Sequence, residues 1–201
     1  KNNLSIITLT AGIETEILVR ENCVDSVRTC YAGLEILGRT PYLCKQTEKG
    51  NLRFIEETEY TLSYGVLAEM LKVPYLPCSA PIGDTDFMKI KPELKQNDNN
   101  LWIPAIKADV TIIHAQQVDI RGNCIILGQY GLDPYLPFIS KKTIITTEKI
   151  IDSSEIDNSK VSILQQQVDA IVEIPKGALP TSCYPYYPVD VPSLINYIDG
   201  C

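Results

Sequence analysis

The sequence predicts an α/β fold in which helices cover a mainly parallel sheet. Six short runs are apolar and β-branched on both faces, which is typical of strands buried in a parallel sheet. These runs are residues 4–9, 24–31, 110–115, 124–127, 143–147 and 168–173. Helical patterns alternate with several of them, and such alternation favours an α/β architecture over an all-β one.

The clearest helical pattern begins at Thr58. Thr58 is a favourable N-cap, and Glu59 follows in the first turn, where the helix dipole stabilises negative charge. Apolar residues then recur at helical spacing until Pro74 ends the run; they are Leu62, Val66, Leu67, Met70 and Leu71.

Two polar stretches and one tight turn separate the predicted elements. Residues 89–100 and 152–160 are rich in Asn, Asp, Ser and Lys, which predicts solvated loops. Gly122 and Asn123 tolerate positive φ angles, so residues 119–123 are predicted to form a tight turn between two strands.

Composition and charge narrow the class of protein. The chain has 201 residues and a formal net charge of −7, without a basic stripe, which argues against a nucleic-acid partner. The start of the chain lacks a secretory leader pattern, and the apolar stretches are too short to cross a bilayer. We therefore expect a soluble, cytoplasmic protein without a membrane partner. A strand-like run close to residue 1 also suggests that an earlier element precedes this chain.

The seven cysteines and the single histidine, His114, are widely spaced along the chain. An odd cysteine count without a CxxC pair argues against a disulfide framework and against a structural zinc site. The expectation from spacing is therefore a set of reduced thiols, with no metal and no tightly bound cofactor.

Common catalytic signatures are missing from the sequence. Neither GxSxG, GxGxxG nor GxxxxGK[ST] occurs, which argues against a hydrolase triad, a dinucleotide fold and a P-loop. Carboxylates remain as candidate catalysts. Glu59 has two open interpretations, a helix-capping carboxylate or an acid, base or nucleophile displayed at a helix start. Glu148 and Glu173 follow or lie in strand-like runs and are each expected to pair with a lysine such as Lys149 or Lys176.

Other candidate binding residues follow the predicted strands. His114 ends one of them, where a polar side chain either faces a ligand crevice or is simply hydrogen-bonded at the sheet. Gly128 and Gly131 follow the next strand, and their lack of a side chain would let backbone amides approach a ligand. Residues 175–182 contain a glycine and small side chains, which suit close approach of a ligand or a partner chain.

Five segments of the chain form an ordered set of motifs. They are residues 73–77 (VPYLP), 108–116 (ADVTIIHAQ), 119–123 (DIRGN), 141–150 (KKTIITTEKI) and 168–182 (VDAIVEIPKGALPTS). Taken in this order, they resemble the A subunits of class I coenzyme A (CoA) transferases, of the glutaconate CoA-transferase type. Each segment alone is a weak signal, but their order along the chain makes the resemblance specific.

The resemblance implies a three-layer α/β domain, related to ribose-5-phosphate isomerase A, over residues 1–201, lacking the family's first strand and glycine-rich loop. It implies a B-subunit partner, in a heterodimer or heterotetramer, that supplies the nucleophilic glutamate. The implied substrates are an acyl-CoA thioester and a carboxylic acid. The expected substrate-binding residues are His114, Gln116, Asn123, Gly128, Gly131 and Asp133.

Two alternatives remain open. Residues 131–135 (GLDPY) also resemble the A subunits of CoA-transferase-like hydrolases that open a ring in a CoA thioester. In that branch a glutamate matching Glu59 is proposed to act in the chemistry, which makes Glu59 the candidate catalytic residue. The second alternative is a non-catalytic scaffolding subunit whose partner carries all the chemistry.

Overall fold

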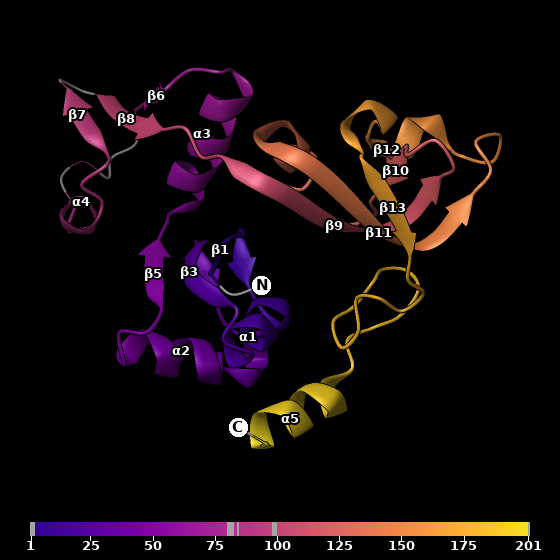
Figure 1. The fold of residues 1–201 in the computed structure, drawn as a ribbon, viewed down its shortest axis with the longest axis horizontal. Helices are drawn as coiled ribbons and strands as arrows, with labels where there is room; N and C mark the ends of the chain where they lie inside the picture. Colours follow the sequence, from indigo (N-terminus) through magenta and orange to yellow (C-terminus); the bar gives the residue numbers. More distant parts are fainter. Residues whose placement is uncertain (1–2, 80–82, 84, 98–99, 201) are drawn as a thin grey trace. The chain divides into compact units, whose positions relative to one another are not determined.

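The computed structural model describes residues 3–79, 83, 85–97 and 100–200 (Figure 1). The chain divides into two units, one formed by residues 1–106 and 195–201 and the other by residues 107–194. The two units are described separately below. The expectation of one domain over residues 1–201 stays a prediction.

The first unit begins with a three-stranded parallel sheet in the order β1-β3-β5. The strands are β1 (Leu4–Ile7), β3 (Val24–Thr29) and β5 (Arg53–Glu56). Helices α1 (Ile13–Arg20) and α2 (Pro41–Glu48) lie beside each other below this sheet in Figure 1. The shared core contains Ala11, Val19, Val24, Val27, Leu43 and Leu52. The strands predicted at residues 4–9 and 24–31 are confirmed, although each is shorter.

Short pairings follow the ends of these two strands. A two-stranded parallel pair joins β2 (Thr10–Ala11) to β4 (Tyr31–Ala32), and a 3₁₀ helix, η1 (Glu35–Leu37), follows β4. The breaks between β1 and β2 and between β3 and β4 explain why the predicted strands were too long.

Helix α3 (Glu59–Met70) confirms the strongest helical prediction. The Thr58 hydroxyl accepts a hydrogen bond from the Thr61 amide at 3.1 Å, and the Thr61 hydroxyl accepts one from the Thr58 amide at 3.0 Å. This reciprocal pair satisfies two amides that a helix start otherwise leaves without partners. Thr58 is therefore the cap, and Glu59 is the first residue of the helix.

A second sheet in this unit is antiparallel, with strand order β6-β8-β7. Its strands are β6 (Tyr75–Cys78), β7 (Lys95–Asn97) and β8 (Asn100–Pro104), and a short helix, α4 (Phe87–Ile90), precedes β7. The prediction of a loop over residues 89–100 is wrong at residues 89–90, which end α4, in β7, and at Asn100, which begins β8. Residues 98–99 of that predicted loop lie outside the described residues. All three β7 side chains are exposed, so this edge strand is held by backbone hydrogen bonds and carries no hydrophobic signal.

The second unit is built on a five-stranded sheet in the order β12-β10-β9-β11-β13. Its strands are β9 (Ala108–Asp119), β10 (Cys124–Ile125), β11 (Ser140–Ile151), β12 (Val161–Ile163) and β13 (Ala170–Glu173). Figure 1 shows the long strands β9 and β11 running side by side. They are parallel, as are β11 and β13, and the register places His114 opposite Thr146. The buried face carries Ile113, Ala115, Val118, Ile145 and Ile163.

Strand β10 departs from the predicted parallel arrangement. It is antiparallel to both β9 and β12, because the turn at residues 119–123 reverses the chain directly after β9. Gly122 adopts a φ of 107° in this turn, as its sequence predicts.

The remaining elements of the second unit are short 3₁₀ helices and the connection to the C-terminal helix. The 3₁₀ helices are η2 (Leu136–Ile139), η3 (Asn158–Lys160) and η4 (Gln165–Gln167). Apart from η3, residues 152–160 form turns and irregular backbone, as predicted. An irregular segment, residues 174–190, then leads from β13 to α5 (Val191–Asp199).

Asp119 holds the β9–β10 turn together. One carboxylate oxygen, Oδ1, accepts hydrogen bonds from the amides of Arg121, Gly122 and Asn123 at 2.8–3.0 Å, and Oδ2 accepts one from Asn123 Nδ2 at 2.9 Å. Burial opposes ionisation of Asp119, but the hydrogen bonds from the side chain and amide of Asn123 and from the Arg121 amide outweigh it and hold its pKa below the ordinary value.

Replacement of Asp119 by alanine is expected to lower the free energy of unfolding by roughly 1.5–3 kcal/mol, because several amides lose a charged acceptor. A lowered folded-state pKa means that this stabilisation is present above the unfolded pKa of about 3.9. It is lost as the pH falls through the lower folded pKa. Urea unfolding at about pH 7 and about pH 3 measures both effects. Asp109→Ala is the control, because its pair with Lys141 at 2.7 Å is exposed and is expected to contribute less than about 1 kcal/mol.

Two further sequence expectations concern the cysteines and the membrane. The six cysteines within the described residues are all free thiols. Over the same residues, no helix has both the length and the apolar character needed to cross a bilayer.

Candidate functional site

A buried ionic cluster lies between strand β3, the start of α3 and the segment after α4 in the first unit. The Glu57 carboxylate is about 1% exposed and pairs with Arg28, while Lys91 Nζ lies 2.6 Å from Glu57 Oε1. Lys91 Nζ also lies 2.7 Å from Glu93 Oε1, and the Thr61 hydroxyl donates a hydrogen bond to Glu57 Oε2. Two cations and two carboxylates thus neutralise one another, which is the condition for burying charge at low cost.

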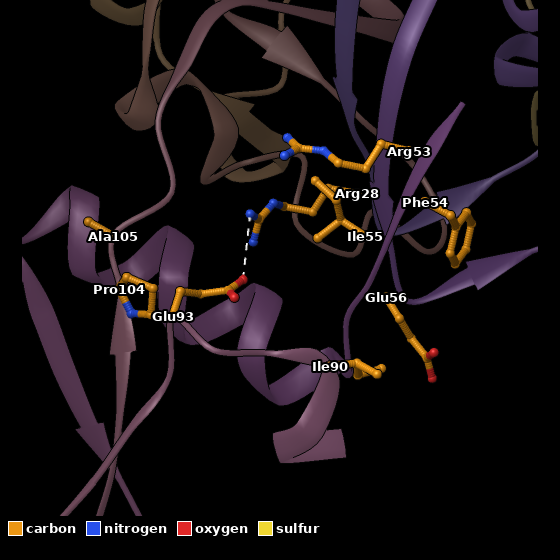
Figure 2. Close-up of a pocket in the computed structure, with 9 residues that line it drawn as sticks. All are labelled: Arg28, Arg53, Phe54, Ile55, Glu56, Ile90, Glu93, Pro104 and Ala105. Atoms are coloured by element: carbon orange, nitrogen blue, oxygen red, sulfur yellow. Dashed lines mark ion pairs between the residues drawn. The ribbon is translucent and has the colours of Figure 1, made fainter. Parts of the chain in front are cut away.

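A cavity of about 680 Å³ lies beside this ionic cluster. Figure 2 shows the guanidinium groups of Arg28 and Arg53 on the same side of the cavity, while the Glu56 carboxylate points away from both. Arg28 and Arg53 come from the neighbouring parallel strands β3 and β5. Arg28 is held by Glu57 and Glu93, whereas Arg53 makes no ion pair with any residue that the structure describes. The cavity therefore presents one unpaired cation to an incoming group.

Glu59 occupies the first position of α3 and its side chain is exposed. The Thr58–Thr61 pair caps this helix, so a capping hydrogen bond does not need Glu59. Glu59 is two residues from Glu57, but it does not line the cavity beside Arg28. An accessible carboxylate at a helix start remains free to meet a substrate or a partner chain.

In the second unit, His114 lies in a polar cluster above β9 and β11. Its Nδ1 lies 2.9 Å from the Thr146 hydroxyl, and its Nε2 lies 2.9 Å from Glu148 Oε1. Glu148 also accepts a hydrogen bond from the Tyr187 hydroxyl. Burial raises the pKa of Glu148, but the hydrogen bonds from Tyr187, the Lys176 amide and His114 outweigh it, so its pKa lies below the ordinary value.

The irregular segment after β13 closes over this cluster. The Lys176 amide donates to Glu148 Oε2 at 2.7 Å, so Glu148 pairs with the backbone of this lysine instead of its ammonium group. A Cβ atom at Gly177 would lie 2.9 Å from His114 Cε1, which explains the glycine. Glu173 likewise binds backbone, accepting from the Ile150 amide at 2.7 Å. The predicted lysine pairings are therefore wrong for both glutamates, because nearby backbone amides supply their hydrogen-bond donors instead.

Gln116 lies on the same face of β9, two residues beyond His114. Its Nε2 donates to the carbonyl of Tyr184 at 2.7 Å, and its Oε1 accepts from the Leu127 amide at 3.0 Å. Gly128 follows Leu127 and adopts a φ of 83°. The fold thus brings together three of the predicted substrate-binding residues, His114, Gln116 and Gly128, around the segment 183–187.

The other predicted substrate-binding residues lie elsewhere in the second unit. Asn123 donates to Asp119 and accepts from the Gln165 amide at 3.1 Å, so its side chain is engaged in the turn. Gly131, with a φ of 49°, and Asp133 lie in the loop after β10. Burial raises the pKa of Asp133 to about 6, which gives this carboxyl group the ability to change its protonation state near neutral pH. The roles of all six residues in substrate binding stay predictions.

Several chemically notable residues were not singled out from the sequence. They are Arg28, Glu57, Lys91, Cys183 and Tyr187. Their contacts with one another and with Glu148 join residues that are mostly far apart along the chain, so no local pattern marks them. Only Glu57 had a local signal in the sequence, because it forms a pair of adjacent carboxylates with Glu56 directly before Thr58, the cap of α3.

A family model described as "Coenzyme A transferase" matches residues 1–174. The chain belongs to the coenzyme A transferase family. The resemblance of the ordered motifs to this family and the predicted α/β fold are thereby confirmed.

Two CoA-transferase relatives align with almost the whole chain. The A subunit of 3-oxoadipate CoA-transferase from Pseudomonas knackmussii is 24% identical, covering 94% of this chain and 70% of the relative. The A subunit of glutaconate CoA-transferase from Acidaminococcus fermentans is 29% identical, covering 93% of this chain and 66% of the relative. The cholesterol ring-cleaving hydrolase IpdA subunit of Mycobacterium tuberculosis is 26% identical, but the match covers 73% of this chain and 56% of the relative. The chain therefore spans about two thirds of the two transferase relatives.

Solved structures share the fold over nearly the full chain. Glutaconate CoA-transferase from Acidaminococcus fermentans matches with a TM-score of 0.89 and 26% identity, covering 98% of this chain and 70% of that chain. A variant of the decarboxylase AibA/AibB matches with a TM-score of 0.88 and 25% identity, covering 99% and 77%. The two transferase relatives that align with the chain are A subunits, the type that its ordered motifs predict.

Proposed function

We propose that this chain is the A subunit of a cytoplasmic CoA transferase that moves CoA from an acyl-CoA thioester to a free carboxylic acid. The observation that carries the proposal is the family match over residues 1–174, with A subunits of CoA transferases among the relatives. A B subunit, in a heterodimer or heterotetramer, completes the enzyme and supplies the glutamate that attacks the thioester. CoA enters as a substrate in this scheme, and no tightly bound cofactor is required.

The chemistry proposed for the complex is covalent catalysis by a carboxylate. The partner's glutamate attacks the thioester carbonyl and displaces the CoA thiolate, which forms a mixed anhydride. CoA thiolate then attacks the glutamyl carbonyl and releases the first carboxylic acid. The incoming acid reverses these steps and leaves as the new acyl-CoA.

In this proposal, the chain's own residues bind and orient the substrates. Among the described residues, Arg53 has no ion-pair partner, so its guanidinium makes the cavity beside Arg28 suitable for an anionic group of a substrate. His114, Gln116, Asn123, Gly128, Gly131 and Asp133 form the proposed substrate contacts of the second unit. Glu59, exposed at the start of α3, is proposed as the acid–base carboxylate of the hydrolase alternative.

Purified complex of this chain with its partner is expected to convert an acyl-CoA only when an acceptor carboxylic acid is present. On incubation with the acyl-CoA alone, a single half-reaction is expected to leave CoA bound to the partner chain as a thioester, because the glutamyl-CoA intermediate accumulates. Mass spectrometry of both chains and chromatography of the CoA products measure these outcomes. Each chain alone serves as the control and is expected to be inactive.

The hydrolase branch is the second candidate, favoured by the IpdA relatives. A ring-opening hydrolase would consume its CoA thioester with water alone and would leave the CoA thioester intact in the product. The hydrolase proposal would therefore replace the transferase proposal if two results were obtained together. The complex would consume a CoA thioester with a ring in its acyl group when no acceptor acid is present, and neither chain would carry bound CoA. Formation of a stable complex with no reaction of either type would support the scaffolding alternative instead.

A further inference from the structure

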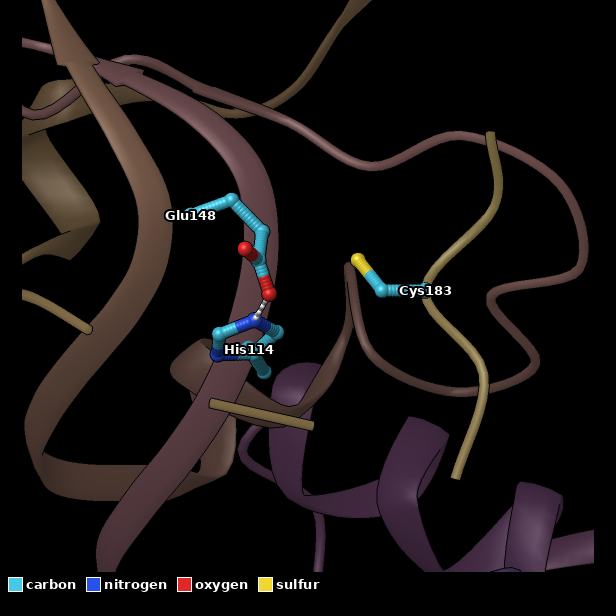
Figure 3. A group of neighbouring side chains, drawn as sticks. All are labelled: His114, Glu148 and Cys183. Atoms are coloured by element: carbon cyan, nitrogen blue, oxygen red, sulfur yellow. Dashed lines mark hydrogen bonds and ion pairs between the residues drawn. The ribbon is translucent and has the colours of Figure 1, made fainter. Parts of the chain in front are cut away.

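The fold gathers three potential metal ligands that lie far apart in the sequence. His114 comes from β9, Glu148 from β11 and Cys183 from the irregular segment after β13 (Figure 3). One ligand atom from each of these residues lies within 4.8 Å of the other two. Cys183 is 5% exposed, and the side chains of His114 and Glu148 are 19% and 8% exposed.

The three donors match the chemistry of a single type of cation. An imidazole nitrogen, a thiolate sulfur and a carboxylate oxygen together suit Zn²⁺, whereas an all-oxygen set would suit Mg²⁺ or Ca²⁺. Three protein ligands leave a fourth tetrahedral position for water. We propose that His114, Glu148 and Cys183 bind one Zn²⁺-type cation in the second unit, so that His114, also a proposed substrate contact, would serve as a metal ligand.

The groups around the three ligands already have the arrangement that supports such a site. The Thr146 hydroxyl lies 2.9 Å from His114 Nδ1, so the proton of a neutral imidazole can sit on Nδ1 and leave Nε2 free for the cation. The Lys176 amide fixes the second oxygen of Glu148 at 2.7 Å, and the Tyr187 hydroxyl donates to the first. Backbone hydrogen bonds between Cys183 and Tyr187, at 3.0 and 3.1 Å, fix the loop that carries the thiol.

Binding would require small, balanced changes. The cation replaces the proton of the Cys183 thiol, which passes to solvent, and the Nε2–Glu148 hydrogen bond opens to admit the ion. A bound cation would link the segment 174–190 to the sheet. Cys183 lies in that segment, whereas His114 and Glu148 lie on strands β9 and β11. The expectation of no metal was based on the spacing of cysteine and histidine residues along the chain. Such spacing cannot reveal a cluster that forms only when the chain folds.

The direct test uses Zn²⁺ alone with the full chain in complex with its partner. Isothermal titration calorimetry is expected to show one Zn²⁺ per copy of this chain, with that binding lost in Cys183→Ser and in His114→Gln. Tyr187→Phe is expected to weaken binding by about 10–100-fold, because it removes a hydrogen bond that orients Glu148. Cys124→Ser is the matched control: Cys124 is another buried free thiol of the same unit, and its loss is expected to leave binding unchanged.

Co²⁺ binding to the unaltered protein keeps the test decisive if a variant fails to fold. A tetrahedral site with one thiolate is expected to give a sulfur-to-cobalt charge-transfer absorption that Zn²⁺ abolishes. The proposal is overturned if the unaltered protein binds no stoichiometric Zn²⁺, or if bound Co²⁺ lacks the thiolate absorption. Binding that persists in both Cys183→Ser and His114→Gln would also overturn it.

Discussion

Replacing Lys91 with methionine is expected to lower the free energy of unfolding by about 3–5 kcal/mol. Lys91 is 2% exposed, and its ammonium group contacts both Glu57 and Glu93 in the buried ionic cluster. Without Lys91, only Arg28 remains to balance two carboxylates, one of which is almost wholly buried. A buried charge that loses its partner is costly, because water no longer solvates it. Urea unfolding followed by circular dichroism measures the change.

Lys89→Met is the matched control for this substitution. Lys89 is two residues away and pairs with Asp86 at 2.6 Å, but both side chains are mostly exposed. An exposed ion pair contributes at most about 1 kcal/mol, since solvent and salt screen it. Equal losses for Lys89→Met and Lys91→Met would show that the buried cluster is not the source of the stability.

In the hydrolase branch, Glu59→Gln is expected to lower the turnover of the complex by roughly 10²–10⁴-fold, the range of a lost acid–base carboxylate. The transferase branch draws its nucleophile from the other subunit, so a collapse in rate would favour the hydrolase. The melting temperature is expected to stay nearly constant, because Thr58 and Thr61 cap the helix and Glu59 is exposed. Only the interaction of Glu59 with the helix dipole is lost, and it contributes about 0.3–1 kcal/mol. Steady-state rates measured beside thermal unfolding separate the two effects.

Glu14→Gln controls for the helix dipole, since Glu14 is an exposed carboxylate in the first turn of α1. Its substitution is expected to cost a similar small amount of stability and no rate. If Glu59→Gln also retains its rate, the acid–base role proposed for Glu59 is wrong. The family assignment would be unaffected, because it does not depend on Glu59.

The hydrophobic pattern of the sequence located β1, β3, β9, β10, β11 and β13, because their apolar β-branched residues favour strands. It also located α3, where a capping threonine, an apolar face and a terminal proline agree with one another. It did not locate β5, β6, β8 or β12. Strand β7 was missed, since its side chains are all exposed and carry no periodic signal. The antiparallel direction of β10 was missed because strand direction depends on pairing, which is a tertiary property.

The candidate site was less accessible to sequence analysis than the fold. His114 and Gln116 could be singled out because they occur within a strand-like run that resembles a known motif. Cys183 and Tyr187 could not, since their significance depends on a loop that returns to β9 and β11. The ionic cluster in the first unit could not be predicted for the same reason, because Arg28, Glu57 and Lys91 meet only in the folded chain.

The pairing of β9 with β11 constrains how this chain can change in length. His114 lies opposite Thr146, and Glu148 lies two residues further along the same face of β11. A shift of one residue in this pairing would turn Glu148 toward the apolar face and bring Thr147 to the polar one. The exposed loop around Gly128 and Gly131, which lies between the two strands, can therefore gain or lose residues only if the pairing of β9 with β11 is unchanged. A duplication or loss of one residue inside either strand would dismantle the polar cluster even if the sheet survived.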